Sequence, residues 1–232
     1  MILRVRFNKK NYLRYIGHLD LMKLFQRNFS RVGIPIKYSE GFNPKPRLSI
    51  ANPLSLGIES EEEYMDVDLE DKISVEEFIK KMNSALPKDV QIIDGKYLEK
   101  GDSISSLIEW TVYEIRFNLL DSIDKTSFEG IIEEWLLKEE IIITRSRKKG
   151  RSKIEQQENI KEFIKEIKLK EIQNNAITIE VIIKSGDNGN LRPLDFMEAL
   201  NRDNNLNMDI DSIMMKRLAM YTEKDGKLYK PF

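Results

Sequence analysis

The chain of 232 residues contains no cysteine and a single histidine. The absence of cysteine excludes disulfides, thiolate zinc sites, cysteine-ligated iron–sulfur clusters and cysteine nucleophiles. A single histidine excludes metal sites built from several imidazoles, and we expect neither a metal nor a cofactor. No apolar run approaches the roughly 18 residues that a membrane span requires, and no signal-peptide core follows the basic N-terminus. We therefore expect a cytoplasmic protein without membrane contact.

The net charge of −1 conceals a strong asymmetry along the chain. Residues 1–56 hold eleven Lys and Arg residues against two acids, whereas residues 57–144 hold nine against twenty-three. Glu59 to Asp71 contains eight acids and no base, and Arg145 to Lys153 contains six bases and no acid. A basic first quarter can attract nucleic acid. The alternative is that basic and acidic segments pair with each other inside one fold.

Hydrophobic periodicity in the first half predicts alternating strands and helices. Strand positions alternate between apolar and polar residues, and helix positions repeat every three to four residues. Ser74 and Glu77 form a capping box at the start of the second helix. The expected elements are strands over 3–7, 36–38, 48–51, 65–69 and 90–98 and helices over 21–32 and 75–86. With the two short strands of the irregular stretch 36–57 taken together, this order is β-α-β-β-α-β, the ferredoxin-like arrangement.

The second half repeats this order. A tight turn at Asn174 and Asn175 joins two of its strands, and Pro193 begins its last helix. The expected elements are strands over 113–117, 140–144, 163–172, 176–184 and 213–221 and helices over 126–136 and 193–200. Gly101, Asp102 and Ser103 interrupt the pattern between the halves. The sequence therefore predicts an α+β protein of two tandem ferredoxin-like units, over 1–100 and 108–232.

The stretch 38–49 (YSEGFNPKPRLS) is the most unusual in the chain. Two prolines two positions apart restrict the backbone and hold their predecessors extended. We interpret the stretch as a stiff loop that loses little entropy on binding. Phe42 could stack on a base, Asn43 supplies polar groups, and Lys45 and Arg47 could meet phosphates. The alternative is a structural loop whose Phe42 fills the core.

Further basic residues precede and follow this loop. Lys23, Arg27 and Arg31 recur every four residues along the first helix, and this stripe could track a phosphate backbone or form an ordinary solvated face. We interpret 145–153 as a flexible basic loop that contacts phosphates regardless of sequence. The candidate nucleic-acid-binding residues are Arg14, Lys23, Arg27, Phe42, Asn43, Lys45, Arg47, Arg145, Arg147, Lys148 and Lys149.

His18 and the acidic run are the remaining candidates for chemistry. His18 stands at the start of the first helix and is either a general acid or base or a structural hydrogen-bonding group. The acidic run lacks the glycine-spaced pattern of a calcium loop. In a ferredoxin-like sheet, Asp66 lies across from Arg4 and Arg6, so internal pairing is favoured over metal binding.

Three segments resemble the radical-SAM-linked family, a bacterial domain of unknown function (2344) that also occurs as a standalone chain. They are YLRYIGHLDLMKLFQR (12–27), YSEGFNPKPRLS (38–49) and LSLGIESEEEYMDV (54–67), with GNLRPLDFMEAL (189–200) as a weaker extension. The resemblance implies a partner, a B12-binding radical SAM enzyme, which would hold the iron–sulfur cluster. Gly17 departs from the family pattern, which has serine there. The doubled ferredoxin-like order is also similar to the repeat-processing ribonucleases of CRISPR systems.

Three functions follow from these observations. The first is a non-catalytic RNA-binding accessory protein that presents a structured ribosomal or transfer RNA to a radical SAM enzyme. The second is a metal-independent endoribonuclease that uses His18. The third is a protein-interaction module whose acidic 59–71 edge docks the radical SAM partner without RNA contact. We prefer the first function, with binding through Arg14, the 38–49 loop and the 145–153 run.

Overall fold

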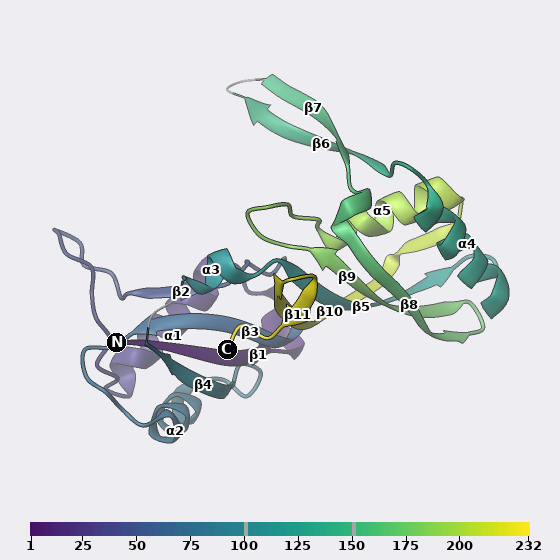
Figure 1. Ribbon diagram of the computed structural model, residues 1–232. Coiled ribbons are helices and arrows are strands. Elements are labelled where there is room, and N and C mark those ends of the chain that lie inside the picture. The colour runs from purple at the N-terminus through teal and green to yellow at the C-terminus, as the bar shows by residue number, and fades with distance from the viewer. Residues whose placement is uncertain (100–101, 150–151) are drawn as a thin grey trace. The chain divides into compact units, whose positions relative to one another are not determined.

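The computed structural model describes residues 1–99, 102–149 and 152–232 (Figure 1). It is a mixed α+β protein with more strand than helix, as the sequence predicts. The chain divides into two units, the first made of Met1–Thr111 and Lys216–Phe232 and the second of Val112–Met215. These bounds group the chain differently from the expected 1–100 and 108–232, because residues 216–232 return to the first unit.

The sheet of the first unit is built around β1 (Ile2–Lys9), which pairs antiparallel with both β3 (Glu59–Asp68) and β4 (Ile92–Leu98). Two strands share the far edge of β3, and each pairs with it over a short stretch. β2 (Leu48–Ile50) pairs antiparallel with residues 65–67, and β10 (Met208–Lys224) pairs parallel with residues 59–60. β11 (Lys227–Tyr229) extends β10. β3 is therefore an interior strand along most of its length.

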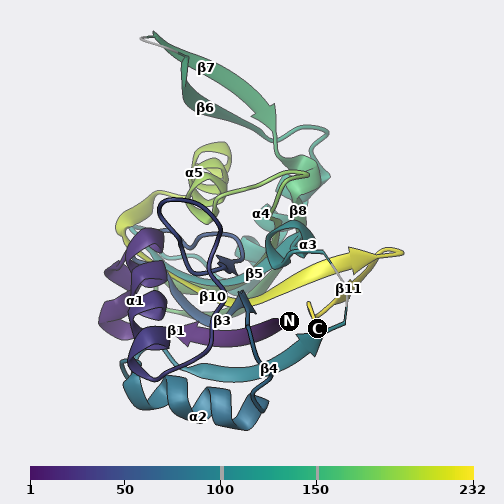
Figure 2. The same ribbon diagram turned by 90° about the vertical axis from the view of Figure 1, so that its left-hand side faces the viewer.

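Two helices cover one face of this sheet, α1 (His18–Arg31) and α2 (Val75–Ala85) (Figure 2). The predicted alternation in β1 is confirmed, since Leu3, Val5 and Phe7 are buried beneath these helices. Phe25 of α1 meets Phe7 edge to face, with 4.9 Å between ring centroids. The Ser74 cap is also confirmed, because its hydroxyl accepts the Glu77 N–H at 3.1 Å. The alternation of apolar residues in β1 and the cap of α2 thus account for the side of the sheet that the helices cover.

The opposite face of the first sheet is covered by α3 (Ile104–Leu107) and by the C-terminal segment. Tyr64 of β3 packs against Phe232, with ring centroids 5.3 Å apart, and against Ile104 and Met220. Both faces of the sheet are consequently closed to solvent over much of their area. Arg4 lies on this covered face and cannot present its charge to a ligand there.

In the second unit the strand order is β10–β5–β9–β8. The strands are β5 (Trp110–Leu119), β8 (Ile164–Gln173) and β9 (Ala176–Lys184), with α4 (Lys125–Leu137), η2 (Lys161–Phe163) and α5 (Pro193–Asn204). β8 and β9 form the predicted hairpin, with Asn174 at a positive φ of 56° in the turn. Alternate residues of β9 are buried, and Trp135 of α4 packs on Phe196 of α5.

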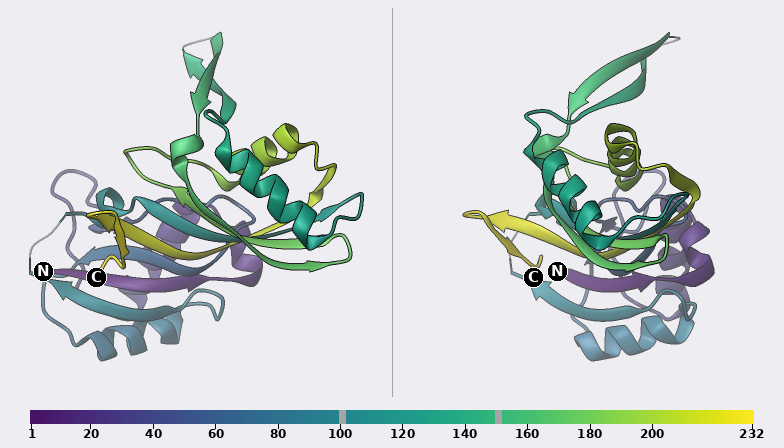
Figure 3. Two further views of the ribbon diagram at one scale, coloured as in Figure 1. Left: turned by 45° about the vertical axis from the view of Figure 1, so that its right-hand side comes forward. Right: turned by 90° about the vertical axis from the view of Figure 1, so that its right-hand side faces the viewer.

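A two-stranded ribbon formed by β6 (Ile142–Lys149) and β7 (Ser152–Asn159) leads away from the rest of the second unit (Figure 3). The expectation of a flexible basic loop over 145–153 is wrong for 145–149 and 152–153, which pair antiparallel in register from Ile142 with Asn159 to Lys149 with Ser152. The residues of this segment have no pattern of β-forming side chains, so its sequence did not indicate a strand. No helix in the described residues is long and apolar enough to span a membrane.

Candidate nucleic-acid interface

Residues 37–47 form an arm whose two sides are hydrogen-bonded to each other. The Arg47 N–H donates to the Lys37 carbonyl at 2.7 Å, and the Ser39 N–H donates to the Lys45 carbonyl at 2.8 Å. The Lys45 N–H returns a bond to the Ser39 hydroxyl at 3.0 Å. Gly41 adopts a φ of 117°, which side chains disfavour, and this permits the tight tip. The arm is thus braced up to its last five residues, as its prolines predict.

The tip of the arm presents an aromatic side chain to solvent. Phe42 is fully exposed, so the alternative that it fills the core is wrong. Asn43, Lys45 and Arg47 are exposed along the same arm. Burying a phenylalanine ring would gain about 1.5–3 kcal/mol, and this gain is forgone at the tip of the arm. The four residues that the sequence predicts here therefore lie together.

The root of the arm is basic. Lys37 and Arg47 both form an ion pair with Asp68, each at 3.3 Å, and the Met1 amino group pairs with it at 3.1 Å, so three cations share one carboxylate. Burial raises the pKa of Asp68, but hydrogen bonds from the Met1 amino group and Lys37 outweigh it and hold that pKa below its usual value. A cavity of about 390 Å³ adjoins the root, and its lining holds one base, Arg47, and three acids, Asp66, Asp68 and Asp102. The root therefore carries Lys37 and Arg47, whereas the cavity beside it is predominantly acidic.

The exposed face of α1 carries the predicted basic stripe. Lys23 and Arg27 are exposed, and Lys23 makes one weak contact, with Asp20 at 3.5 Å. Both line a cavity of about 270 Å³ that Leu13, Ile16 and Pro87 close from the other side. Arg14 is in a different situation. It lies in η1 (Asn11–Tyr15) and pairs with Glu59 at 3.3 Å, so its charge is already neutralised.

His18 is the first residue of α1 and is partly exposed. The residue before it, Gly17, occupies the N-cap position and supplies no side-chain bond, as expected from the missing hydroxyl. The imidazole lies outside the arm, on the element that carries the basic stripe. Within the described residues, the structure does not assemble a pair of acid and base around it.

The basic run of the second unit is only partly described. Arg145 forms ion pairs with Glu158 on β7 at 2.7 Å and with Asp195 on α5 at 3.3 Å, and it donates to the Asn190 carbonyl. The run contains no acid, and Arg145 finds its partners outside it, at carboxylates that are distant in sequence and adjacent in space. The side chains of Arg147, Lys148 and Lys149 lie outside the described part of the structure.

The acidic run is paired internally, as the sequence favours. The ion pairs join Glu59 to Arg14, Glu61 to Lys10, Glu62 to Arg6, Glu63 to Arg217, Asp66 to Arg4 and Asp68 to Lys37. Most of these carboxylates are buried or partly buried on an interior strand. Six of the eight acids of the run thus compensate a base of another part of the fold, and this pairing argues against 59–71 as a docking edge.

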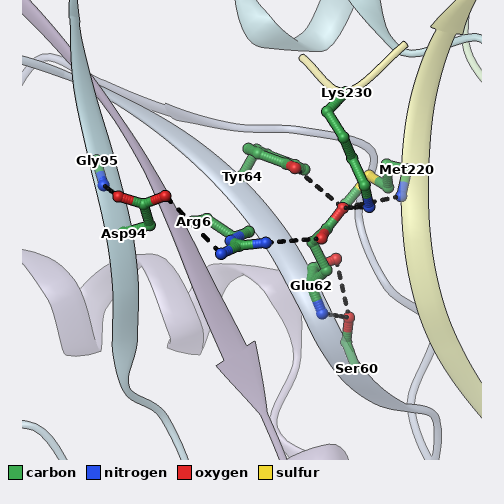
Figure 4. A network of polar contacts seen from close by, with 8 residues as sticks. All are labelled: Arg6, Ser60, Glu62, Tyr64, Asp94, Gly95, Met220 and Lys230. Atoms are coloured by element: carbon green, nitrogen blue, oxygen red, sulfur yellow. Dashed lines mark hydrogen bonds and ion pairs between the residues drawn. The ribbon is translucent and has the colours of Figure 1, made fainter. Parts of the chain in front are cut away.

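Glu62 lies at the centre of a network of hydrogen bonds and ion pairs (Figure 4). Its carboxylate accepts from Arg6 at 3.2 Å and from the Tyr64 hydroxyl at 2.9 Å, and it also receives the Lys230 ammonium and the Met220 N–H. These donors come from β1, β3, β10 and the C-terminal segment. Because the carboxylate is buried, its loss would leave several donors without an acceptor. The network ties the C-terminal segment to the sheet.

Two exposed aromatic residues are not among the binding residues predicted from the sequence. Tyr12 and Tyr15 lie in η1 and are 85% and 59% exposed. Their spacing of three is also helical, so the α-helical pattern of the neighbouring residues concealed them. In a 3₁₀ helix, positions i and i+3 share one face. That signal was present in the sequence but is recognisable only once the short helix is known.

Comparison with known protein families shows the family to which the chain belongs. A family model described as "Uncharacterized protein conserved in bacteria (DUF2344)" matches residues 3–193. The chain belongs to this family. A comparison with curated proteins gave no match. The DUF2344 match covers β1 through the start of α5, and therefore includes the arm, η1 and α1.

Solved structures resemble the chain in fold. A chain in a crystal structure of a Cbf5–Nop10–Gar1 complex aligns with a TM-score of 0.53 and 8% sequence identity, over 96% of this chain and 50% of that chain. A chain in a structure of an H/ACA ribonucleoprotein bound to a substrate RNA containing 2′-deoxyuridine gives the same TM-score and identity, over 96% and 49%. This chain thus spans about half the length of the chains it resembles. At such identity the likeness concerns the fold alone.

Proposed function

We propose that this DUF2344 protein is an RNA-binding accessory protein that holds a structured RNA for a partner radical SAM enzyme. The observation that carries the proposal is the fully exposed Phe42 at the tip of a hydrogen-bonded arm. Aromatic side chains on rigid supports stack unpaired bases, and adjacent cations meet the backbone. Lys45 supplies such a cation, and Arg47 supplies another at the root of the arm.

The fold supports RNA as the ligand. The strand order β4–β1–β3–β2 in the first unit and β10–β5–β9–β8 in the second is the order of a ferredoxin-like sheet, with the β6–β7 ribbon inserted in the second. We therefore interpret the units as a tandem ferredoxin-like pair. One structure of similar fold is a ribonucleoprotein bound to a substrate RNA, which agrees with an RNA ligand.

The radical SAM partner rests on the family resemblance of segments 12–27, 38–49 and 54–67. A chain without cysteine cannot ligate an iron–sulfur cluster, so any such chemistry belongs to another protein. Isolation of the tagged protein from bacterial cells under anaerobic conditions tests this part. Recovery of an iron–sulfur protein together with RNA is the expected result. Recovery of RNA without an iron–sulfur protein would contradict the partner and leave RNA binding in place.

RNA binding is tested at the arm tip. We expect Phe42→Ala to weaken binding of a transcribed transfer RNA by about fivefold to a hundredfold, the loss expected for one base stack. Phe42→Tyr retains a ring and should bind like the parent. Leu137→Ala, which truncates another exposed apolar residue, is the matched control. Filter binding measures all four proteins. If Phe42→Ala binds as tightly as the parent, the arm does not bind RNA.

A further inference from the structure

Tyr12 and Tyr15 form a pair of exposed rings on one face of η1. A 3₁₀ helix has three residues per turn, so these two side chains stand one above the other. Leu13 of this helix and Ile16, the extended residue that follows it, pack against the core of the first unit. The short helix therefore separates an apolar inner face from an aromatic outer face.

This helix is fixed at both ends. Asn11 adopts a positive φ of 49°, its N–H donates to Glu59 at 3.1 Å, and its side chain donates to Asp89 at 2.8 Å. At the other end the Arg14 carbonyl accepts the Gly57 N–H at 3.0 Å. The rings thus stand on a rigid support, and little conformational entropy is lost when a ligand meets them.

Cations lie around the short helix. The guanidinium of Arg14 lies over the Tyr15 ring at 5.0 Å from its centroid, and it pairs with Glu59 at 3.3 Å. Lys23 and Arg27 line a cavity of about 270 Å³ that Leu13 of this helix and Ile16, the residue after it, also line. Asp20 is the single acid in that lining, and it contacts Lys23. The lining therefore holds two cations against one acid, on the side of the helix that Leu13 faces.

We propose that Tyr12 and Tyr15 form a stacking platform for an unpaired RNA segment whose phosphates lie on Lys23 and Arg27. Rings stack on bases of every type, and cations beside them follow the backbone, so the combination selects single strands rather than a sequence. The inference rests on the proposed RNA-binding function and deepens it, because it names the single-stranded part of the RNA as the ligand of this surface. The surface is distinct from the arm in residues and in element.

The test separates stacking from apolar bulk. Tyr12→Leu with Tyr15→Leu keeps apolar side chains and removes both rings, whereas Tyr12→Phe with Tyr15→Phe keeps the rings. Tyr229→Leu, at another exposed tyrosine, is the matched control. Fluorescence anisotropy measures binding of a 12-nucleotide oligouridine and of a 12-base-pair RNA duplex. Circular dichroism verifies that each variant is folded.

We expect the double leucine variant to lose about tenfold or more in affinity for oligouridine, with the salt dependence unchanged because no phosphate contact is lost. Duplex binding, the double phenylalanine variant and Tyr229→Leu should match the parent. Equal oligouridine affinity of the double leucine variant and the parent would overturn the platform. Equal losses on both RNAs would do so as well, since they indicate a structural effect or a protein-docking surface.

The Phe42→Ala variant is measured beside these proteins. If it loses affinity for transfer RNA while the double leucine variant retains oligouridine affinity, the platform fails and the proposed function stands. If only the double leucine variant loses affinity, the platform stands and the arm does not bind RNA. If the parent binds neither RNA, both proposals fail. An iodouridine-substituted oligonucleotide should also cross-link to Tyr12 or Tyr15, and cross-links confined to other residues would contradict the platform.

Discussion

Arg217 donates from one guanidinium nitrogen to both carboxylate oxygens of Glu63, at 2.9 and 3.0 Å, although the two residues are 154 positions apart. Both side chains are almost completely buried. Lys9 lies close to the same pair, and burial lowers the pKa of its ammonium, while Glu63 raises it and Arg217 lowers it further. The pair fixes β10 to β3 and so completes the first unit.

Removal of one partner of this pair should be costly. We expect Arg217→Met to lower the free energy of unfolding by about 3–5 kcal/mol, because the Glu63 carboxylate loses its main buried partner. Replacing both residues, Arg217→Met with Glu63→Leu, should recover much of that loss, since neither charge is then buried alone. Arg116→Met, at an exposed arginine, is the control. Urea unfolding followed by circular dichroism measures each change, and a single variant as stable as the control would refute the expectation.

The arm should contribute charge as well as stacking. We expect Lys45→Ala with Arg47→Ala to weaken RNA binding and to reduce the slope of log affinity against log salt by roughly 0.7–0.9 per lost phosphate contact. The hydrogen bonds that brace the arm come from backbone groups and Ser39, so the fold should persist. Filter binding at two salt concentrations gives the slope. Lys80→Ala, on the exposed face of α2, should leave it unchanged.

Tyr64 should make stability depend on alkaline pH. Burial, reinforced by Glu62, raises the pKa of its hydroxyl above the ordinary value of 10.0. The contribution of a raised pKa is fully present below pH 10 and declines as pH rises, because the unfolded chain releases that proton first. Relative to Tyr64→Phe, the parent should therefore lose about 1.4 kcal/mol of unfolding free energy per pH unit above 10. Urea unfolding at pH 8, 10 and 11 compares the two, and parallel pH profiles would contradict this.

His18 separates an accessory protein from a ribonuclease. We expect His18→Ala to change RNA affinity by less than about twofold, because the side chain lies outside the arm that carries the proposed contacts. Incubation of the parent with labelled transfer RNA in the presence of a chelator should leave the RNA intact. Cleavage by the parent that disappears in His18→Ala would favour the endoribonuclease alternative and contradict the accessory role.

Local features of the fold could be predicted because they depend on neighbouring residues. The alternation of Leu3, Val5 and Phe7, the Ser74 cap and the turn at Asn174 each arise within a few positions of the chain. The stiffness of the arm follows in the same way from Pro44 and Pro46. Such short-range patterns encode the elements and their order, and the element order in turn suggests the sheet.

Long-range partners could not be predicted in this way. Arg145 meets Asp195 on α5, and Arg217 meets Glu63 on β3, and no local pattern announces either pair. For the same reason Arg14 was expected to be available for RNA, although Glu59 neutralises it. The exposure of a candidate residue was predicted best where that residue forms no contact with a distant part of the chain, as at Phe42.

The split composition of the first unit has a consequence for the order of events during synthesis. The second unit is one continuous segment, Val112–Met215, inserted between two parts of the first. Translation finishes that segment before it supplies Lys216–Phe232, so Arg217 becomes available to Glu63 and Asn52 only after the inserted segment has been made. We therefore expect the inserted segment to mature first on the ribosome, and the N-terminal sheet to remain a client for chaperones until the last strand arrives.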